Sequence, residues 1–306
     1  MFGLGTYNYE HFSREILREL AGARFSGPVP GERAPDFKAA TLKGETLNLA
    51  DFRGKKNLLL LFGSATCPMT AASIGRLNEL YDRFRGDDIE FLFVYVREAH
   101  PGEQIRAHRS IAEKREAARL LRDEEEIEMP MLVDDVSGAI HRKYSRLPSP
   151  AFLIDRSGRV AFRSMWAGPD GIEAAIHELL ELQQERGVDH VVVKGGQDLS
   201  EPLSYARLSS YRALERGGER SLSDFRKALG FSHRAFAASR GKQSLIENPG
   251  RIVAVSALTA AVLAGGLYAG FELRKKRLGL RNPYRAYEKD RVRDTETGTD
   301  YGAVGI

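Results

Sequence analysis

Cys67 is the only cysteine in the 306-residue chain, and it stands where an apolar run gives way to a helical pattern. Residues 59–62 are Leu-Leu-Leu-Phe, residues 63–66 are small, and Cys67-Pro68 opens the helical stretch. This order predicts a buried strand, a tight turn and a helix start, with the thiol at the turn. The free N–H groups and the positive dipole end of a helix N-terminus favour thiolate, the nucleophilic form. The structural alternative is a small buried core residue, a common fate of free cysteine.

The single cysteine also limits the chemistry. Residues 67–70 read Cys-Pro-Met-Thr, so the second thiol of a Cys-x-x-Cys redox motif is missing and no disulfide can form within the chain. An oxidised Cys67 therefore needs an external thiol reductant, such as thioredoxin or glutathione, or a second chain. We expect no bound cofactor and no metal, because His190 and His233 are isolated from other ligand-type residues.

The elements around Cys67 predict the fold. Two apolar strands over residues 57–62 and 89–96 flank a helical pattern over 70–84, which indicates a right-handed parallel β-α-β unit. A hairpin over 151–164 and a helix over 172–184 follow. This is the order of the thioredoxin fold, so we expect an α/β, thioredoxin-like domain with a mixed central sheet flanked by helices.

Weaker patterns predict further elements. A charged helix is expected over 103–126, and Ser221 or Ser223 is the expected N-cap of a later helix. The other expected elements are an amphipathic helix within 8–22, a hairpin over 37–49, short strands over 131–133 and 188–193, and helices over 204–216 and 223–229.

The C-terminal part predicts a membrane anchor. Residues 252–271 carry no charged side chain and are long enough for a helix to cross a hydrocarbon core of roughly 30 Å. Gly266 and Gly270 form a GxxxG pattern that lets two helices approach, which is compatible with a homodimer. An Ala/Gly-rich buried helix is the alternative. The N-terminus lacks the features of a signal peptide, so we expect a single-pass membrane protein with a cytosolic catalytic domain.

Composition and pattern together divide the chain. The formal net charge is +4 and no nucleic-acid motif is present, so we expect no nucleic-acid partner.

The expected division of the chain is an N-terminal amphipathic segment (1–30), a thioredoxin-like catalytic domain (31–186), a mostly helical connector (187–250), a transmembrane helix (251–273) and a tail that is first basic and then disordered (274–306).

Two motifs resemble one enzyme family. The stretch LFGSATCPMT, followed one strand later by YVREAHPGE, is similar to the iodothyronine deiodinases, which carry selenocysteine where this chain has Cys67. The resemblance covers about residues 35–182 and implies a membrane-anchored, thioredoxin-fold reductase that removes halogen from an aromatic ring. The matching residues are Gly63, Ser64, Thr66, Cys67 and Pro68 in the first motif, and Tyr95, Glu98, Ala99, His100 and Pro101 in the second.

The resemblance implies a role for each site residue. Cys67 is the nucleophile that attacks iodine, and His100, oriented by Glu98, belongs to the path of the proton that the aromatic carbon needs. The expected contacts to substrate or thiolate are Ser64, Thr66, Tyr95 and His108. The expected partners are a halogenated aromatic or peroxide-type small molecule, a thiol reductant and the lipid membrane.

Two other functions remain open from the residues. A one-cysteine peroxiredoxin-like peroxidase would carry a hydroxyl three residues before the thiol, where Ser64 stands, but Leu60 occupies the place of its proline. A non-catalytic, membrane-tethered redox sensor or scaffold would use Cys67 for a disulfide between two chains.

Overall fold

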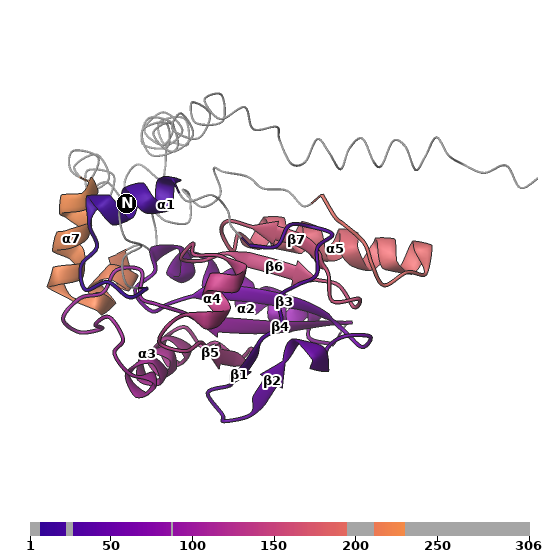
Figure 1. Cartoon of the computed structure of the whole chain (residues 1–306), viewed down its shortest axis with the longest axis horizontal. Coiled ribbons are helices and arrows are strands. Elements are labelled where there is room, and N and C mark those ends of the chain that lie inside the picture. The colour runs from indigo at the N-terminus through magenta and orange to yellow at the C-terminus, as the bar shows by residue number, and fades with distance from the viewer. Residues whose placement is uncertain (1–6, 23–26, 87, 195–210, 230–306) are drawn as a thin grey trace, which may run out of the picture. The chain divides into compact units, whose positions relative to one another are not determined.

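Two strands of apolar residues, β3 (Asn57–Gly63) and β4 (Ile89–Tyr95), run parallel in the middle of a five-stranded sheet of order β5-β4-β3-β6-β7. Helix α2 (Pro68–Phe84) connects them (Figure 1). The computed structural model describes residues 7–22, 27–86, 88–194 and 211–229. The other elements are α1 (Arg14–Gly22), β1 (Lys38–Ala40), β2 (Thr46–Asn48), α3 (Ile111–Glu124), β5 (Met131–Val133), α4 (Ala139–Tyr144), β6 (Ala151–Ile154), β7 (Val160–Ser164), α5 (Pro169–Arg186) and α7 (Glu219–Leu229).

The chain order confirms the predicted thioredoxin-like α/β fold. The unit β3-α2-β4 is followed by α4, the antiparallel hairpin β6-β7 and the closing helix α5, and β6 pairs antiparallel with β3. The segment α3-β5 is inserted between β4 and α4, and β5 pairs parallel with β4. The insertion therefore widens the sheet without disturbing the strand-turn-helix junction that carries the thiol.

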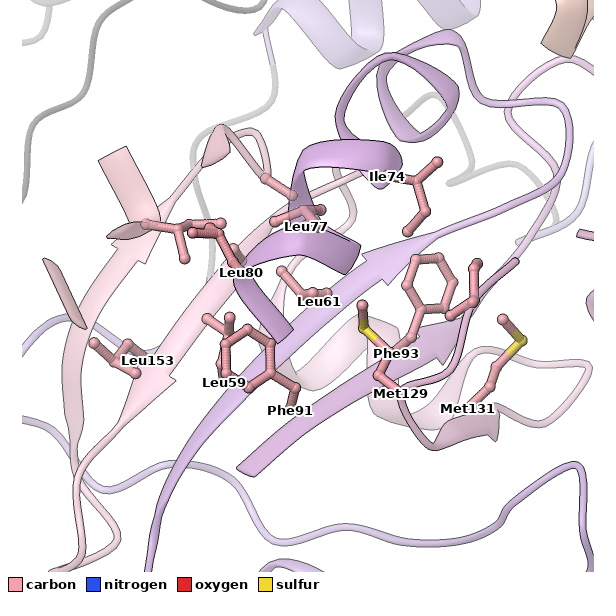
Figure 2. Packing of buried hydrophobic residues seen from close by; sticks show 14 of the residues in the cluster. Leu59, Leu61, Ile74, Leu77, Leu80, Phe91, Phe93, Met129, Met131 and Leu153 are labelled. Atoms are coloured by element: carbon pink, nitrogen blue, oxygen red, sulfur yellow. The ribbon is translucent and has the colours of Figure 1, made fainter. Parts of the chain in front are cut away.

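One apolar core lies between the sheet and α2. Leu59 and Leu61 point to the same face because side chains alternate along a strand, and they pack near Ile74, Leu77 and Leu80 of α2 (Figure 2). Fully burying each such side chain contributes about 1.5–3 kcal/mol relative to leaving it exposed. Helices α3 and α5 add Ala118, Leu121, Ile172, Ile176 and Leu179 to this core.

The opposite face of the sheet has a second core. Leu58, Leu60 and Phe62 alternate with the residues of the first core and pack against Leu49 and Tyr144, the last residue of α4. Because both faces are covered, every residue of β3 is buried. The strand that leads to the thiol is therefore held on both sides.

Segments of the chain itself cover both edges of the sheet. Beyond β5, Thr41 of the hairpin region forms an isolated antiparallel bridge with Leu132. Beyond β7, the Gly31 N–H donates to the Val160 carbonyl at 2.8 Å, and the Val160 N–H donates to the Glu32 carbonyl at 2.9 Å. Loop backbone thus satisfies groups that an open edge would leave to water.

The predicted charged helix begins later than expected. Residues 103–110 are not helical, and α3 starts at Ile111 because Ser110 caps it. The Ser110 hydroxyl accepts the Glu113 N–H at 3.2 Å, and the Glu113 carboxylate accepts the Ser110 N–H at 3.3 Å. This capping box fixes the helix start and leaves residues 103–110 as the loop that carries His108.

Two other local predictions were wrong. Residues 188–193 form no strand. Isolated hydrogen bonds hold them in place instead, such as the one from the Val193 N–H to the Ala161 carbonyl at 3.1 Å. Helix α7 begins at Glu219, so Ser221 and Ser223 lie inside it and not at its N-cap. The helix predicted within 8–22 is present as α1, which begins at Arg14. Helix α4 was not predicted.

Part of the predicted organisation falls on residues that are not described. The transmembrane helix (251–273) and the tail (274–306) lie outside the described residues, as do residues 195–210 and 230–250 of the connector. Within the described part of the chain, none of the helices combines the length and apolar character that a membrane crossing requires.

A buried amide pair links the sheet to α5, and it can be tested. Gln183 donates to Asn57 Oδ1 at 3.0 Å and accepts from Asn57 Nδ2 at 2.9 Å. We expect Gln183→Ala to lower the free energy of unfolding by about 1–3 kcal/mol, because it leaves buried polar groups unpaired. Urea unfolding followed by circular dichroism measures this. Gln184, its exposed neighbour on α5, supplies the matched control: Gln184→Ala should stay within about 0.5 kcal/mol, and equal losses would contradict the prediction.

Candidate active site

Cys67 caps the N-terminus of α2 at the end of a tight turn. Its N–H donates to the Ser64 carbonyl at 3.2 Å, and its carbonyl accepts the Ala71 N–H at 3.1 Å. The last residue of β3, Gly63, has no room for a side chain, because a Cβ there would collide with Thr70 and with a ring atom of Phe93. The thiol therefore lies at the predicted junction, but its residue is only 1% exposed.

The carboxylate of Glu98, in the loop after β4, joins the two motifs. Its Oε2 accepts the Thr66 N–H at 2.9 Å and the Thr66 hydroxyl at 2.6 Å. Its Oε1 accepts the Tyr95 hydroxyl and lies 3.0 Å from His108 Nε2. Because Thr66 precedes Cys67 directly, Glu98 ties the loop that carries the thiol to the loop that carries His108.

This hydrogen bonding keeps Glu98 ionised although it is buried. Burial acts to raise the pKa of the Glu98 carboxyl, but His108, Thr66 and Tyr95 together bring that pKa below its ordinary value. Burial, followed by the charge of Glu98, raises the pKa of the Tyr95 hydroxyl, so Tyr95 stays a neutral donor. The site therefore holds a fixed negative charge at neutral pH.

The thiol itself is not held as thiolate in this arrangement. Burial raises the pKa of Cys67, and the charge of Glu98 adds to the rise. The Thr70 hydroxyl and the N–H groups of Thr70 and Met69 act in the opposite direction without overcoming burial. The helix N-terminus favours the thiolate as the sequence indicates, but desolvation of a sulfur charge is the larger effect here.

His100 is equally enclosed. Its N–H donates to the Thr66 hydroxyl at 3.0 Å, and its ring lies between Phe12 and Phe225, with ring centroids 4.1 and 5.3 Å away. Burial lowers the pKa of His100 to about 3, against a weaker effect of Glu98, so the imidazole is neutral at pH 7. Among the described residues its buried Nδ1 has no hydrogen-bond partner. Such a nitrogen is suited to a water or ligand.

A segment that we expected to be a connector packs onto the thiol's loop. Residues 211–217 are helical, and Arg216 donates to the Ala65 carbonyl at 2.7 Å. The same guanidinium pairs with Glu125 at 2.6 Å. This contact was not predicted, because nothing in the sequence around Arg216 indicates that its side chain reaches the Ala65 carbonyl, about 150 residues earlier in the chain.

The N-terminal segment also reaches the site, through Tyr9 and Phe12. The Tyr9 hydroxyl donates to the Ala99 carbonyl at 2.7 Å, and Phe12 packs on His100. Helices α1 and α7 lie side by side over this end of the sheet (Figure 1). The density of aromatic residues at positions 7–12 was the one available signal for this contact.

The structure thus brings the predicted site residues together. Thr66, Tyr95, Glu98 and His108 share one network, and the Ser64 hydroxyl lies beside it, where it accepts the N–H of Ala99, the residue after Glu98, at 3.2 Å. Within the described ranges, no group of three or more histidine, cysteine, aspartate or glutamate residues could hold a metal ion.

Comparisons with known proteins agree with the thioredoxin-like fold. The model of the AhpC/TSA family matches residues 30–163. The chain is 30% identical over 169 residues to the type I iodothyronine deiodinase of Xenopus laevis, covering 52% of this chain and 66% of that protein. It is 28% identical over 151 residues to the thiol-disulfide oxidoreductase ResA of Bacillus cereus, covering 49% of this chain and 72% of that protein.

A solved thiol-disulfide oxidoreductase from Bacteroides fragilis aligns over 49% of this chain and 99% of its own, with 23% identity and a TM-score of 0.36. The matched region spans between half and two thirds of the deiodinases. The match to the AhpC/TSA family model and the partial similarity to ResA agree with the topology, which is that of a thioredoxin-like α/β fold.

The influence of Glu98 on the thiol gives a direct test. We expect Glu98→Gln to lower the pKa of Cys67, because it removes a negative charge that opposes the thiolate. The pH dependence of iodoacetamide alkylation reports this pKa cleanly, since Cys67 is the only cysteine. The alkylation midpoint should move to lower pH.

The partly exposed Glu90, on β4, serves as control for a general charge effect, and Glu90→Gln should leave the midpoint in place. Circular dichroism checks that both variants fold. A midpoint that stays or rises in folded Glu98→Gln would contradict the electrostatic argument.

Proposed function

We propose that this protein is a single-cysteine thiol oxidoreductase that reductively removes halogen, in the first instance iodine, from a phenolic ring. The observation that carries the proposal is the pair of hydrogen bonds from Thr66 to Glu98, which join the Cys67 turn to the second motif. The similarity to the Xenopus laevis deiodinase over the same region supports the reaction class.

In the proposed reaction the Cys67 thiolate attacks the iodine atom of an aryl iodide. A sulfur–iodine bond forms, the carbon–iodine bond breaks, and the ring carbon keeps the electron pair and takes a proton. An external thiol then displaces iodide and forms a mixed disulfide with Cys67, which a second external thiol resolves. The ring gains two electrons, and the two external thiols become one disulfide.

The other site residues have separate roles in this proposal. His100 supplies the proton to the ring carbon, and it must gain that proton when the site opens, because its imidazole is neutral while buried. Glu98 is a positioning residue that holds Thr66 and favours the charged imidazole. Tyr95 and His108 keep the Glu98 carboxylate in place, and Ser64 and Thr66 line the turn beside the sulfur.

A one-cysteine peroxidase is the second candidate. The position of Ser64, three residues before the thiol in a buried turn, favours it. In that reaction the thiolate attacks a peroxide oxygen, the O–O bond breaks, and Cys67 becomes a sulfenic acid that external thiols reduce. The two candidates share the nucleophile and differ in the atom that it attacks.

We also propose that residues 251–273 anchor the protein in a membrane as a single pass, with the catalytic domain in the cytosol. The uncharged stretch 252–271 supports this, and Gly266 and Gly270 support a homodimer across the same helix. Alkaline carbonate extraction of membranes carrying the full chain tests the anchor. Release of the protein into the soluble fraction would contradict it.

Turnover by the full chain tests the proposed reaction. Wild type and Cys67→Ser are compared for iodide release from an iodinated phenol and for reduction of hydrogen peroxide, each with excess dithiothreitol. We expect wild type to release iodide faster than it consumes peroxide, and Cys67→Ser to lose at least about a hundredfold in rate, because serine is a far weaker nucleophile at neutral pH.

Each outcome has a distinct meaning. Faster peroxide reduction would favour the peroxidase, and activity that survives Cys67→Ser would overturn both candidates. If wild type reduces neither compound but forms a Cys67-dependent dimer on a non-reducing gel, the sensor or scaffold function replaces them. Thermal unfolding of both proteins shows whether a loss reflects chemistry or misfolding.

A further inference from the structure

Residues 211–229 are defined here as the lid. They form a helical stretch over 211–217, a turn at Gly218 and helix α7. Gly218 has a φ of 100°, a backbone conformation that favours glycine, and a Cβ there would collide with the Glu103 carboxylate. The turn therefore brings the start of α7 against the loop that follows His100.

The apolar side chains of the lid form a cluster of their own. Neither of the two cores of the sheet includes a residue of the lid. The separate cluster consists of Tyr211, Leu214, Leu222 and Phe225. A segment that packs on itself can leave the rest of the protein while exposing less apolar surface than a segment of the main core would. The lid is therefore suited to opening as one unit.

A carboxylate of the catalytic domain holds the start of α7. Glu103 Oε1 accepts the Glu219 N–H at 2.5 Å, and Glu103 Oε2 accepts the Arg220 N–H at 2.8 Å. The first N–H groups of a helix have no partner within the helix, and the helix dipole favours a negative charge there. The hydrogen bond from the Arg220 N–H lowers the pKa of the Glu103 carboxyl, so this contact is charged at neutral pH.

Backbone groups join the lid beside this carboxylate. The Gln104 N–H donates to the Gly217 carbonyl at 3.1 Å, and the Arg220 guanidinium donates to the Gly102 carbonyl. A Cβ at Gly102 would collide with the Gly217 carbonyl, so the two backbones approach closely. These contacts are hydrogen bonds, which water can replace when the two surfaces separate.

Two arginines hold the other helix of the lid, and Glu125 is their shared partner. Arg216 pairs with Glu125 at 2.6 Å, and Arg212 pairs with Glu125 at 2.8 Å. The side chains of Arg216 and Glu125 are 6% and 8% exposed, so removing one charge leaves the other poorly compensated. Because Arg216 also donates to the Ala65 carbonyl at 2.7 Å, the lid is fastened to the turn that carries Cys67.

The closed lid encloses His100. Phe225 of α7 meets the imidazole edge-on, and Phe12 covers it as well, with ring centroids 5.3 and 4.1 Å from that of His100. Among the described residues, neither His100 Nδ1 nor the buried Ser221 hydroxyl of the lid has a hydrogen-bond partner. Buried polar atoms without partners destabilise the closed form, and water can satisfy both when the lid opens.

We propose that residues 211–229 gate the candidate active site, and that the lid opens as one unit when its contacts with Glu103 and Glu125 are released. The inference rests on the proposed function only for the role of His100 as proton donor. With the lid closed, the imidazole is shut off from water. With the lid open, it can take up the proton that the proposed reaction requires.

The reactivity of His100 toward diethyl pyrocarbonate, which modifies neutral imidazoles, tests the gate without any turnover. In the full chain, Glu103→Gln and Glu125→Gln should each raise the rate of modification at His100 by about fivefold or more, because each weakens one contact in a single opening equilibrium. Peptide mass spectrometry identifies the modified residue. Glu128→Gln is the matched control, since Glu128 lies in the same loop as Glu125 but pairs with Arg85, outside the lid. It should change the rate less than about twofold.

Hydrogen–deuterium exchange gives a second measurement, which also uses wild type. The amides of α7 should exchange at least about tenfold faster than those of β3, because lid opening does not require the sheet to unfold. Each variant should also speed exchange in the helix that it does not touch: Glu103→Gln in residues 211–217, and Glu125→Gln in α7.

The outcomes separate the gate from the proposed function. Lid amides that exchange only together with the sheet would overturn the gate even in a protein that releases iodide. So would a change in His100 modification that is absent from either folded variant, because the segment would then not open as one unit. A lid that opens in a protein that converts neither an iodinated phenol nor peroxide would leave the gate standing and refute the proposed function.

Discussion

The site depends on one buried charge, the carboxylate of Glu98. A charge taken out of water costs several kcal/mol unless hydrogen bonds and an opposite partner offset it, so its neighbours are tightly constrained. Thr66 must present both its N–H and its hydroxyl, and Tyr95 and His108 must approach the other oxygen. These donors can converge because β3 and β4 are adjacent and parallel, which brings their carboxyl ends to the same edge of the sheet.

The two reactive groups of the enclosed site, the Cys67 thiol and the His100 imidazole, are both uncharged. Burial outweighs the helix N-terminus at Cys67 and leaves a neutral thiol, and it outweighs Glu98 at His100 and leaves a neutral imidazole. Both groups hold their uncharged forms for the same reason, which is the absence of water around them. Reactivity of either group is thereby coupled to hydration of the site, and not only to its hydrogen-bond geometry.

Local patterns in the sequence predicted the parts of the fold that local forces determine. The apolar runs located β3 and β4, and the helical spacing of Ile74, Leu77 and Leu80 located α2. The strand expected over 188–193 does not form, because its valines make only isolated hydrogen bonds to the β6-β7 hairpin and no continuous strand pairing. Val193 donates to the Ala161 carbonyl and Val191 to the Asp155 carboxylate.

The candidate site was predictable where its residues lie in the two motifs, and not beyond them. Thr66, Glu98 and His108 stand within short stretches of sequence, whereas Phe12 and Phe225 meet around His100 from distant parts of the chain. Periodicity reports which face of an element is apolar, but not which distant partner covers it. The contacts that enclose His100 could therefore not be predicted from the sequence.

The covered edges of the sheet have a consequence for how copies of the protein meet. An exposed edge strand offers a row of unpaired backbone groups on which another chain can build, a common first step in aggregation. Here residues 31 and 32 occupy the outer side of β7, and Thr41 occupies that of β5. Both of these loops come from the stretch that precedes β3. Residues 31–41 thus cover two edge strands that come much later in the chain, and they leave the ribosome before either β5 or β7 is synthesised.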